Sequence, residues 1–127
     1  MKSVVYGILI ISFATILSSS DSSPLAKLMR QMLTFVKTEK LLIEKNAPRQ
    51  KFPKQFALIK TAKVTPGKKL STDHAQYIQN FQTELSTYYN KEVNRKEQFN
   101  KVVNTCINCH QRECPGPIQT IEQNIIK

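Results

Sequence analysis

Residues Thr105 to Cys114 read TCINCHQREC, and this stretch holds every thiol group of the chain. It contains all three cysteines and one of the two histidines of a 127-residue sequence. Cys106 and Cys109 are three residues apart, and His110 follows directly. Side chains three residues apart lie on the same face of a helix. We therefore expect the two thiols to point in one direction, with the imidazole beside them.

The spacing of these residues, C-x-x-C-H, is the attachment sequence of c-type haem. Two sulfurs on one helical face can add to the two vinyl groups along one edge of the porphyrin. His110 then projects toward the iron and can bind it through one ring nitrogen, while the other ring nitrogen needs a hydrogen-bond acceptor. The motif predicts one covalent haem c held by Cys106 and Cys109, with His110 as the proximal iron ligand.

Other uses of these side chains are less consistent with the sequence. A thioredoxin-like dithiol would follow a strand, and no strand pattern precedes Cys106. A zinc site would have to combine the cysteines with His110, and adjacent side chains about 100° apart on one helix make a tetrahedral cage awkward. A disulfide between Cys106 and Cys109 would strain the helix. Cys114 is expected to pack near the haem or the helix end as a small apolar group, with a redox-active thiol as the alternative.

The remainder of the chain predicts helices. Gly67 and Gly116 are the only glycines after the first twenty residues, and no stretch alternates polar and apolar residues with a period of two. Apolar residues instead recur at three- and four-residue steps. We expect helices over residues 24–46, 53–64, 73–90 and 92–114, and a tail over 118–127 that packs its isoleucines onto them. Short connections between four amphipathic helices predict an all-α, antiparallel four-helix bundle around the haem.

The N-terminal residues predict export. Lys2 supplies a positive start, and Val4–Leu17 is almost entirely apolar. That run is about 14 residues long, which is short of the ~20 residues that cross a bilayer as a helix. Ser18–Ser20 then offer the small residues that a signal peptidase accepts. We expect residues 1–20 to be a signal peptide and residues 21–127 to be one domain, periplasmic or otherwise exported, without a stable membrane span. A retained membrane anchor is the alternative.

A helical bundle whose last long helix carries C-x-x-C-H resembles the cytochrome c′ group, the class II c-type cytochromes. The resemblance covers the mature chain in architecture, and the haem motif is its specific part. The family often has an aromatic and a basic residue shortly after the histidine, whereas Gln111–Cys114 follow here. The chain thus resembles a divergent member, and the resemblance implies electron transfer and a homodimer.

The resemblance also implies that one residue of the first helix faces the open side of the haem. A methionine there gives six-coordinate iron that carries electrons, and an apolar residue gives five-coordinate iron that binds nitric oxide or carbon monoxide. Counting back from the end of that helix places Met29 at this position, with Met32 as the second candidate. Both methionines can instead be core residues.

Two further polar residues have simpler expectations. His74 lies near the start of the third predicted helix and is expected at the surface or as a cap; a bis-histidine haem is the alternative. Arg112 follows the motif and can pair with a haem propionate, because its guanidinium group matches the geometry of a carboxylate. An exposed arginine is the alternative.

The formal net charge of +10 favours acidic partners. The lysines are spread along the chain without a dense basic block, and an exported protein rarely meets nucleic acid. We expect a solvated basic surface that can speed association with acidic redox proteins. No pair of carboxylates or nucleophile constellation indicates an enzyme. The sequence therefore predicts an exported monohaem cytochrome that carries single electrons, with a gas-binding haem protein and a haem-free helical interaction domain as alternatives.

Overall fold

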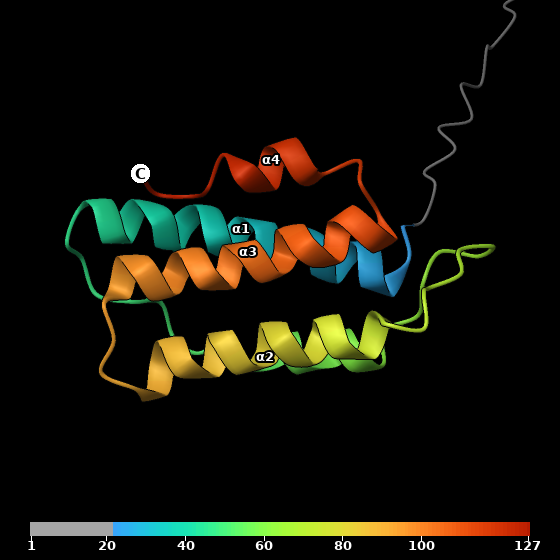
Figure 1. Cartoon of the computed structure of the whole chain (residues 1–127), viewed down its shortest axis with the longest axis horizontal. Helices are drawn as coiled ribbons and strands as arrows, with labels where there is room; N and C mark the ends of the chain where they lie inside the picture. Colours follow the sequence, from blue (N-terminus) through green and yellow to red (C-terminus); the bar gives the residue numbers. More distant parts are fainter. Residues whose placement is uncertain (1–21) are drawn as a thin grey trace, which may run out of the picture.

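The computed structural model describes residues 22–127, so the expected signal peptide lies outside the described part of the chain. Its elements are α1 (Pro24–Glu44), the 3-10 helix η1 (Lys54–Lys60), α2 (His74–Asn90), α3 (Arg95–Glu113) and α4 (Ile118–Glu122). Within residues 22–127 there is no strand. Figure 1 shows α1, α2 and α3 running along the long axis of the molecule, with α4 on the outside. The expected all-α helical bundle is confirmed.

The second predicted helix is wrong in type and length. Residues 53–64 were expected to be α-helical, but the structure forms a 3-10 helix of seven residues, Lys54–Lys60. Its buried side chains, Phe56 and Ile59, are three residues apart. A spacing of three matches the three-residue turn of a 3-10 helix, in which side chains at i and i+3 lie above one another. This short helix is enough to bury both side chains against α1 and α2.

The ends of the long helices depend on capping side chains. The Ser23 hydroxyl accepts a hydrogen bond from the Ala26 amide at 3.2 Å, and Pro24 occupies the first turn of α1. The fourth predicted helix was expected to begin at Glu92, but α3 begins later. The Asn94 side chain accepts a hydrogen bond from the Glu97 amide at 2.9 Å, and this cap sets the start.

The core lies between the three long helices, where α2 and α3 form the most extensive contact. Tyr88, Phe99 and Val103 are its most deeply buried large or branched side chains. The C-terminal tail closes one side, because Ile121 is buried and the Asn100 side chain bonds the backbone of Ile126 in both directions. The prediction that the tail packs its isoleucines onto the bundle is confirmed.

A buried polar cluster ties α1, α2 and α3 together beyond the core. Glu39 has no exposed surface, and its carboxylate lies 2.8 Å from the Arg95 guanidinium. The same carboxylate accepts hydrogen bonds from the Tyr88 hydroxyl and from the backbone and side chain of Gln50. Burial alone would raise the pKa of Glu39, but these hydrogen bonds outweigh it and lower the pKa below its ordinary value. Glu39 therefore stays ionised, and its charge is matched.

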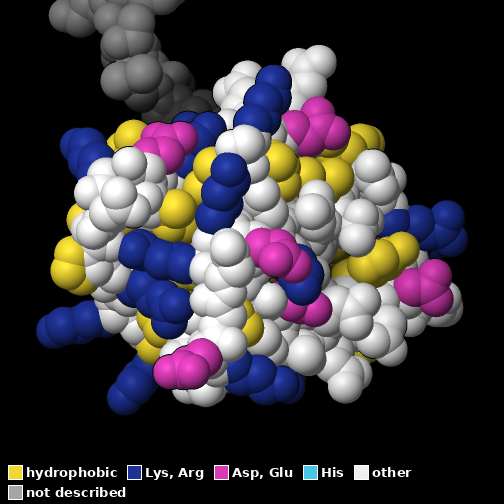
Figure 2. Space-filling view, turned by 60° about the vertical axis from the view of Figure 1, so that its left-hand side comes forward, with side chains coloured by type: hydrophobic (Ala, Val, Ile, Leu, Met, Phe, Trp, Pro, Cys, Tyr) yellow, Lys and Arg dark blue, Asp and Glu magenta, His cyan; other side chains and the backbone are white. Residues whose placement is uncertain are grey.

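The surface agrees with the predicted spread of charge. Figure 2 shows lysine and arginine side chains scattered over one face, with acidic side chains between them and no single basic block. Among residues 22–127, none of the helices has both the length and the apolar character that crossing a bilayer requires.

Candidate haem site

A cavity of about 370 Å³ opens among α1, η1, α2, α3 and α4. Most of the side chains that line it are apolar, including Phe56, Ile78 and Val102. Its volume falls within the range of roughly 300–1,000 Å³ that is usual for small-molecule and cofactor sites. The bundle therefore has room for a bulky apolar ligand in its interior.

The three residues of the C-x-x-C-H motif all line this cavity. They belong to the last turns of α3, whose buried stripe includes Phe99, Val102 and Val103. Cys106 follows these valines by three and four residues and so lies on the same stripe. The packing of α3 against α2 thus turns Cys106, Cys109 and His110 toward one enclosed apolar space.

The thiols of Cys106 and Cys109 are free, and both residues are half-buried. Burial raises the pKa of Cys106 to about 12 and that of Cys109 to about 11. The raised pKa values mean that the thiolate form of both groups is disfavoured in the free chain. Within residues 22–127, moreover, no three His, Cys, Asp or Glu side chains are close enough to hold a metal ion together.

The orientation of His110 leaves one ring nitrogen available. Its Nδ1 atom lies 2.9 Å from the carbonyl oxygen of Cys114. A carbonyl oxygen only accepts hydrogen bonds, so Nδ1 carries the proton and the Nε2 lone pair is free. Cys114 is the C-cap of α3, where helix carbonyls lack intrahelical donors, so its oxygen is available for this bond. The acceptor that the motif was expected to need is provided by the chain four residues later.

Both candidate methionines line the same cavity from α1. Met32 is buried, with 6% of its surface exposed, and Met29 is partly buried. Leu25 and Leu33 line the cavity beside them. The structure therefore brings Met29 and Met32 together with the motif, and it places both sulfur-containing and purely aliphatic side chains on this wall.

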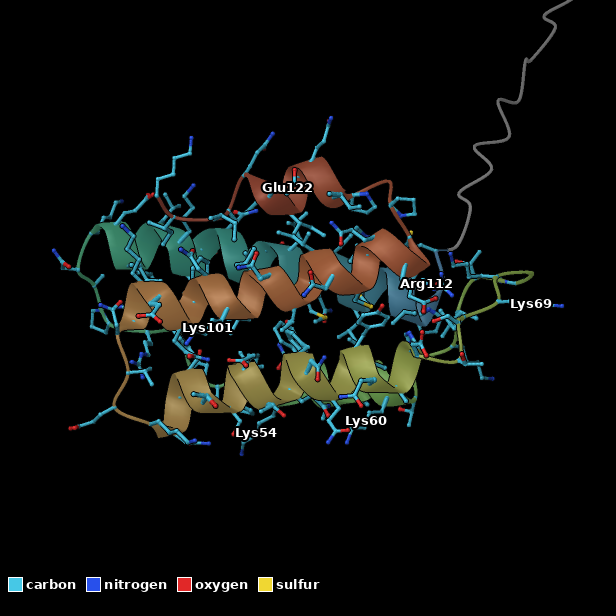
Figure 3. All side chains as sticks on the ribbon, in the orientation of Figure 1. Lys54, Lys60, Lys69, Lys101, Arg112 and Glu122 are labelled. Atoms are coloured by element: carbon cyan, nitrogen blue, oxygen red, sulfur yellow. The ribbon has the colours of Figure 1, made fainter. Side chains whose placement is uncertain are left out.

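Arg112 is not brought to the cavity. Its side chain is exposed, and it is absent from the cavity wall. Figure 3 shows it near the end of α3. In the structure, the cationic side chains on the wall are Arg30 and Lys68. Neither was recognised in the sequence, because an exposed arginine or lysine in a basic chain carries no distinguishing pattern.

His74 was expected at the surface or as a cap, and this expectation is wrong. Its side chain is 17% exposed, and it lines the cavity. Its Nδ1 atom is buried without a hydrogen-bond partner. A signal was present in the sequence, since His74 precedes Ile78 by one helical turn and thus belongs to the apolar stripe of α2.

Glu113 is a second residue whose role the sequence did not reveal. It is buried, and its carboxylate accepts hydrogen bonds from the Ser71 amide at 3.0 and 3.2 Å and from the Ser71 hydroxyl. Burial would raise the pKa of Glu113, but the bonds from Ser71 outweigh it and lower the pKa. Lys68 donates to the Glu113 carbonyl oxygen. These contacts fasten the loop before α2 to the end of α3, next to the motif.

The fold and site together define a helical bundle with an apolar interior cavity into which a C-x-x-C-H motif points. No family model, curated protein or solved structure matches this chain. The inference of function therefore depends on the cavity, the motif and the chemistry of their side chains.

Proposed function

We propose that this protein is an exported monohaem c-type cytochrome that carries single electrons. The observation that supports the proposal best is that Cys106, Cys109 and His110 line one apolar cavity of about 370 Å³. The donor set fits a c-type haem, because it offers two thiols for covalent links and one imidazole with a free nitrogen for the iron. On this proposal the bundle is a variant of the antiparallel four-helix arrangement, with η1 in place of the second helix.

Each residue has a defined task in this proposal. Cys106 and Cys109 would hold the porphyrin through thioether links, and the Nε2 atom of His110 would bind the iron. The hydrogen bond from His110 Nδ1 to the Cys114 carbonyl oxygen fixes the tautomer and the plane of the ring. The apolar wall would keep water away from a bound haem. It would therefore favour whichever oxidation state of the iron gives the site the smaller charge. A haem held there would supply one-electron chemistry to the site.

The mass of the exported protein tests the proposal directly. We expect mature protein from the native exported fraction to weigh more than its polypeptide by one haem, and to show a Soret absorbance that persists in denaturant. A chain produced without export should weigh only its polypeptide mass, because c-type haem is attached outside the cytoplasm. If the exported protein also weighs only its polypeptide mass, the haem is absent and the proposal is wrong.

The sixth position on the iron can be tested by spectroscopy. We propose Met29 as the distal ligand, so the ferrous protein should show the sharp α band of low-spin iron. Met29→Ala should convert it to the broad band of high-spin iron. Met32→Ala is the matched control, because it removes a second cavity methionine of the same helix while leaving Met29 in place. An unchanged spectrum in Met29→Ala together with a converted one in Met32→Ala would assign the bond to Met32 instead.

A gas-binding protein is the second candidate function. The observation in its favour is that Leu25 and Leu33 line the cavity beside the methionines, so aliphatic groups are available to face the iron. In that case the wild-type ferrous protein is high-spin and binds carbon monoxide or nitric oxide. Absence of haem altogether would leave the third candidate, a helical interaction domain.

The partners proposed for an electron carrier follow from charge. The net charge of +10, or +9 once Lys2 is removed with the signal peptide, favours acidic redox proteins, and such attraction acts mainly on the rate of association. The proposal includes a periplasmic or otherwise exported location, and a homodimer as in the cytochrome c′ group.

A further inference from the structure

Two cationic side chains stand on the wall of a cavity that is otherwise mostly apolar. Arg30 reaches it from α1, and Lys68 reaches it from the loop before α2. The four ion pairs formed by residues 22–127 involve neither of them. Arg30 instead donates to the Ser22 hydroxyl at 2.6 Å, and Lys68 donates to the Glu113 carbonyl oxygen. Both positive charges are therefore held in place by neutral acceptors.

Hydrogen bonds place the two cations at the same end of the bundle. The Leu25 amide donates to the Lys63 carbonyl oxygen at 3.1 Å, and the Ser23 and Thr65 hydroxyls are 3.2 Å apart. These bonds hold the loop that carries Lys68 against the first turn of α1, one turn or so before Arg30. The cavity wall at this end thus carries positive charge from two different segments.

His74 adds an independent observation at this end. Among residues 22–127, its Nδ1 atom is the only buried side-chain nitrogen or oxygen without a hydrogen-bond partner. The nearest carboxylate oxygen, Glu113 Oε1, is 4.0 Å away, which is too long for a hydrogen bond. Buried polar atoms in native proteins almost always have a partner, so Nδ1 retains the capacity to bind a ligand group or a water molecule.

The carboxylate of Glu113 also lies at this end, and its negative charge would repel an acidic ligand. Its carboxylate is directed to Ser71, from which it accepts three hydrogen bonds. Lys68 and His74 lie close to it and offset its charge. The cluster therefore retains the capacity to bind a further carboxylate through Arg30, Lys68 and His74.

We propose that Arg30, Lys68 and His74 form a carboxylate-binding rim at the mouth of the cavity, and that this rim receives the propionate groups of the haem. The inference depends on the proposed function, because it assigns the polar end of the same ligand. An apolar wall with a cationic rim matches a flat apolar ring that carries two carboxylates at one edge. Arginine and lysine bind such groups through charge-assisted hydrogen bonds.

The test separates the rim from the covalent links. The mature chain with Cys106→Ala and Cys109→Ala is titrated with two probes, iron protoporphyrin IX and its dimethyl ester, and binding is followed by the Soret band. The ester lacks both carboxylates but keeps the ring and the iron. We expect the ester to bind at least about tenfold more weakly, as the loss of charge-assisted bonds predicts.

Variants of the rim then decide which residues are responsible. The double variant Arg30→Gln, Lys68→Gln should lower the affinity for iron protoporphyrin IX until it is no more than about threefold higher than the affinity for the ester. His74→Phe, which keeps a ring but removes both nitrogens, should weaken the acid form and leave the ester unchanged. The charge-matched control is Lys69→Gln with Arg112→Gln, because both residues lie outside the cavity wall. Figure 3 shows Lys69 pointing away from the body of the protein.

The outcomes are distinct. Equal binding of acid and ester by the chain with the intact rim would overturn the rim and leave the haem proposal standing. An equal loss in the control pair would overturn the assignment to Arg30 and Lys68. If neither probe binds although circular dichroism shows the helices to be intact, both the rim and the haem cavity are wrong.

Discussion

Replacement of Arg95 by methionine is expected to lower the free energy of unfolding by about 3 kcal/mol at neutral pH, near the lower end of the roughly 3–5 kcal/mol found for broken buried ion pairs. The partner carboxylate, Glu39, is fully buried, and Arg95 lies 2.8 Å from it with 23% of its side chain exposed. Methionine conserves much of the length of the side chain but leaves Glu39 as an uncompensated charge. Chemical denaturation of the mature protein, followed by circular dichroism, measures the difference.

A surface ion pair provides the matched control. Lys101 and Glu97 lie 3.3 Å apart one turn along α3, but their side chains are 54% and 67% exposed. Lys101→Met should therefore cost no more than about 0.5 kcal/mol. Glu39→Gln combined with Arg95→Met should recover part of the loss, because it removes the unpaired charge as well. If Arg95→Met costs no more than Lys101→Met, the cluster does not stabilise the fold in the way described.

The cost of Arg95→Met should also depend on pH. The folded-state pKa of Glu39 is lowered from 4.5, so its stabilising contribution is present above the unfolded pKa and is lost as the pH falls through the lowered folded pKa. Without Arg95, the burial of Glu39 is opposed by fewer hydrogen bonds and its pKa rises. The difference in free energy of unfolding between wild type and variant should thus be largest at a pH above the raised pKa of Glu39 in the variant, and it should narrow as the pH falls through that pKa.

Most of the fold follows from periodicity that is visible in the sequence. The three long helices could be predicted because their apolar residues recur at helical steps and because prolines mark the start of α1 and the end of α3. Residues 53–64 were misread because a spacing of three between Phe56 and Ile59 fits either helix type over so short a span. The start of α3 was misplaced because the Asn94 cap depends on one side-chain hydrogen bond.

The candidate site likewise contains some residues that could be predicted from the sequence and others that could not. Cys106, Cys109 and His110 could be predicted because the chemistry of attachment fixes their spacing along one segment. The place of His74 on the buried face could be predicted from its spacing to Ile78, but the contacts of Glu113 with Ser71 and His74 could not, because they join residues about 40 positions apart that only the folded chain brings together. Periodicity reveals which face of a helix is buried, but not which polar groups meet there.

Replacement of both Cys106 and Cys109 by serine is expected to abolish covalent haem in the exported protein. A serine hydroxyl does not form the thioether link, although it preserves the size of the side chain. Intact mass spectrometry should show the bare polypeptide, and haem staining after denaturing electrophoresis should be lost. Either single variant should retain at most one link and should reduce the yield of haem-loaded protein.

Cys114→Ser is the control, because Cys114 contributes to the site through its backbone and not through its sulfur. Its thiol group is free and the residue is exposed, and its contribution to His110 comes from the backbone carbonyl oxygen, which serine also provides. This variant should therefore retain haem. Alkylation gives the complementary result: in unfolded wild-type protein only Cys114 should react with iodoacetamide, since the other two sulfurs are already bonded to carbon. Three alkylated cysteines in the exported protein, or loss of haem in Cys114→Ser alone, would contradict the assignment of Cys106 and Cys109 as the attachment residues.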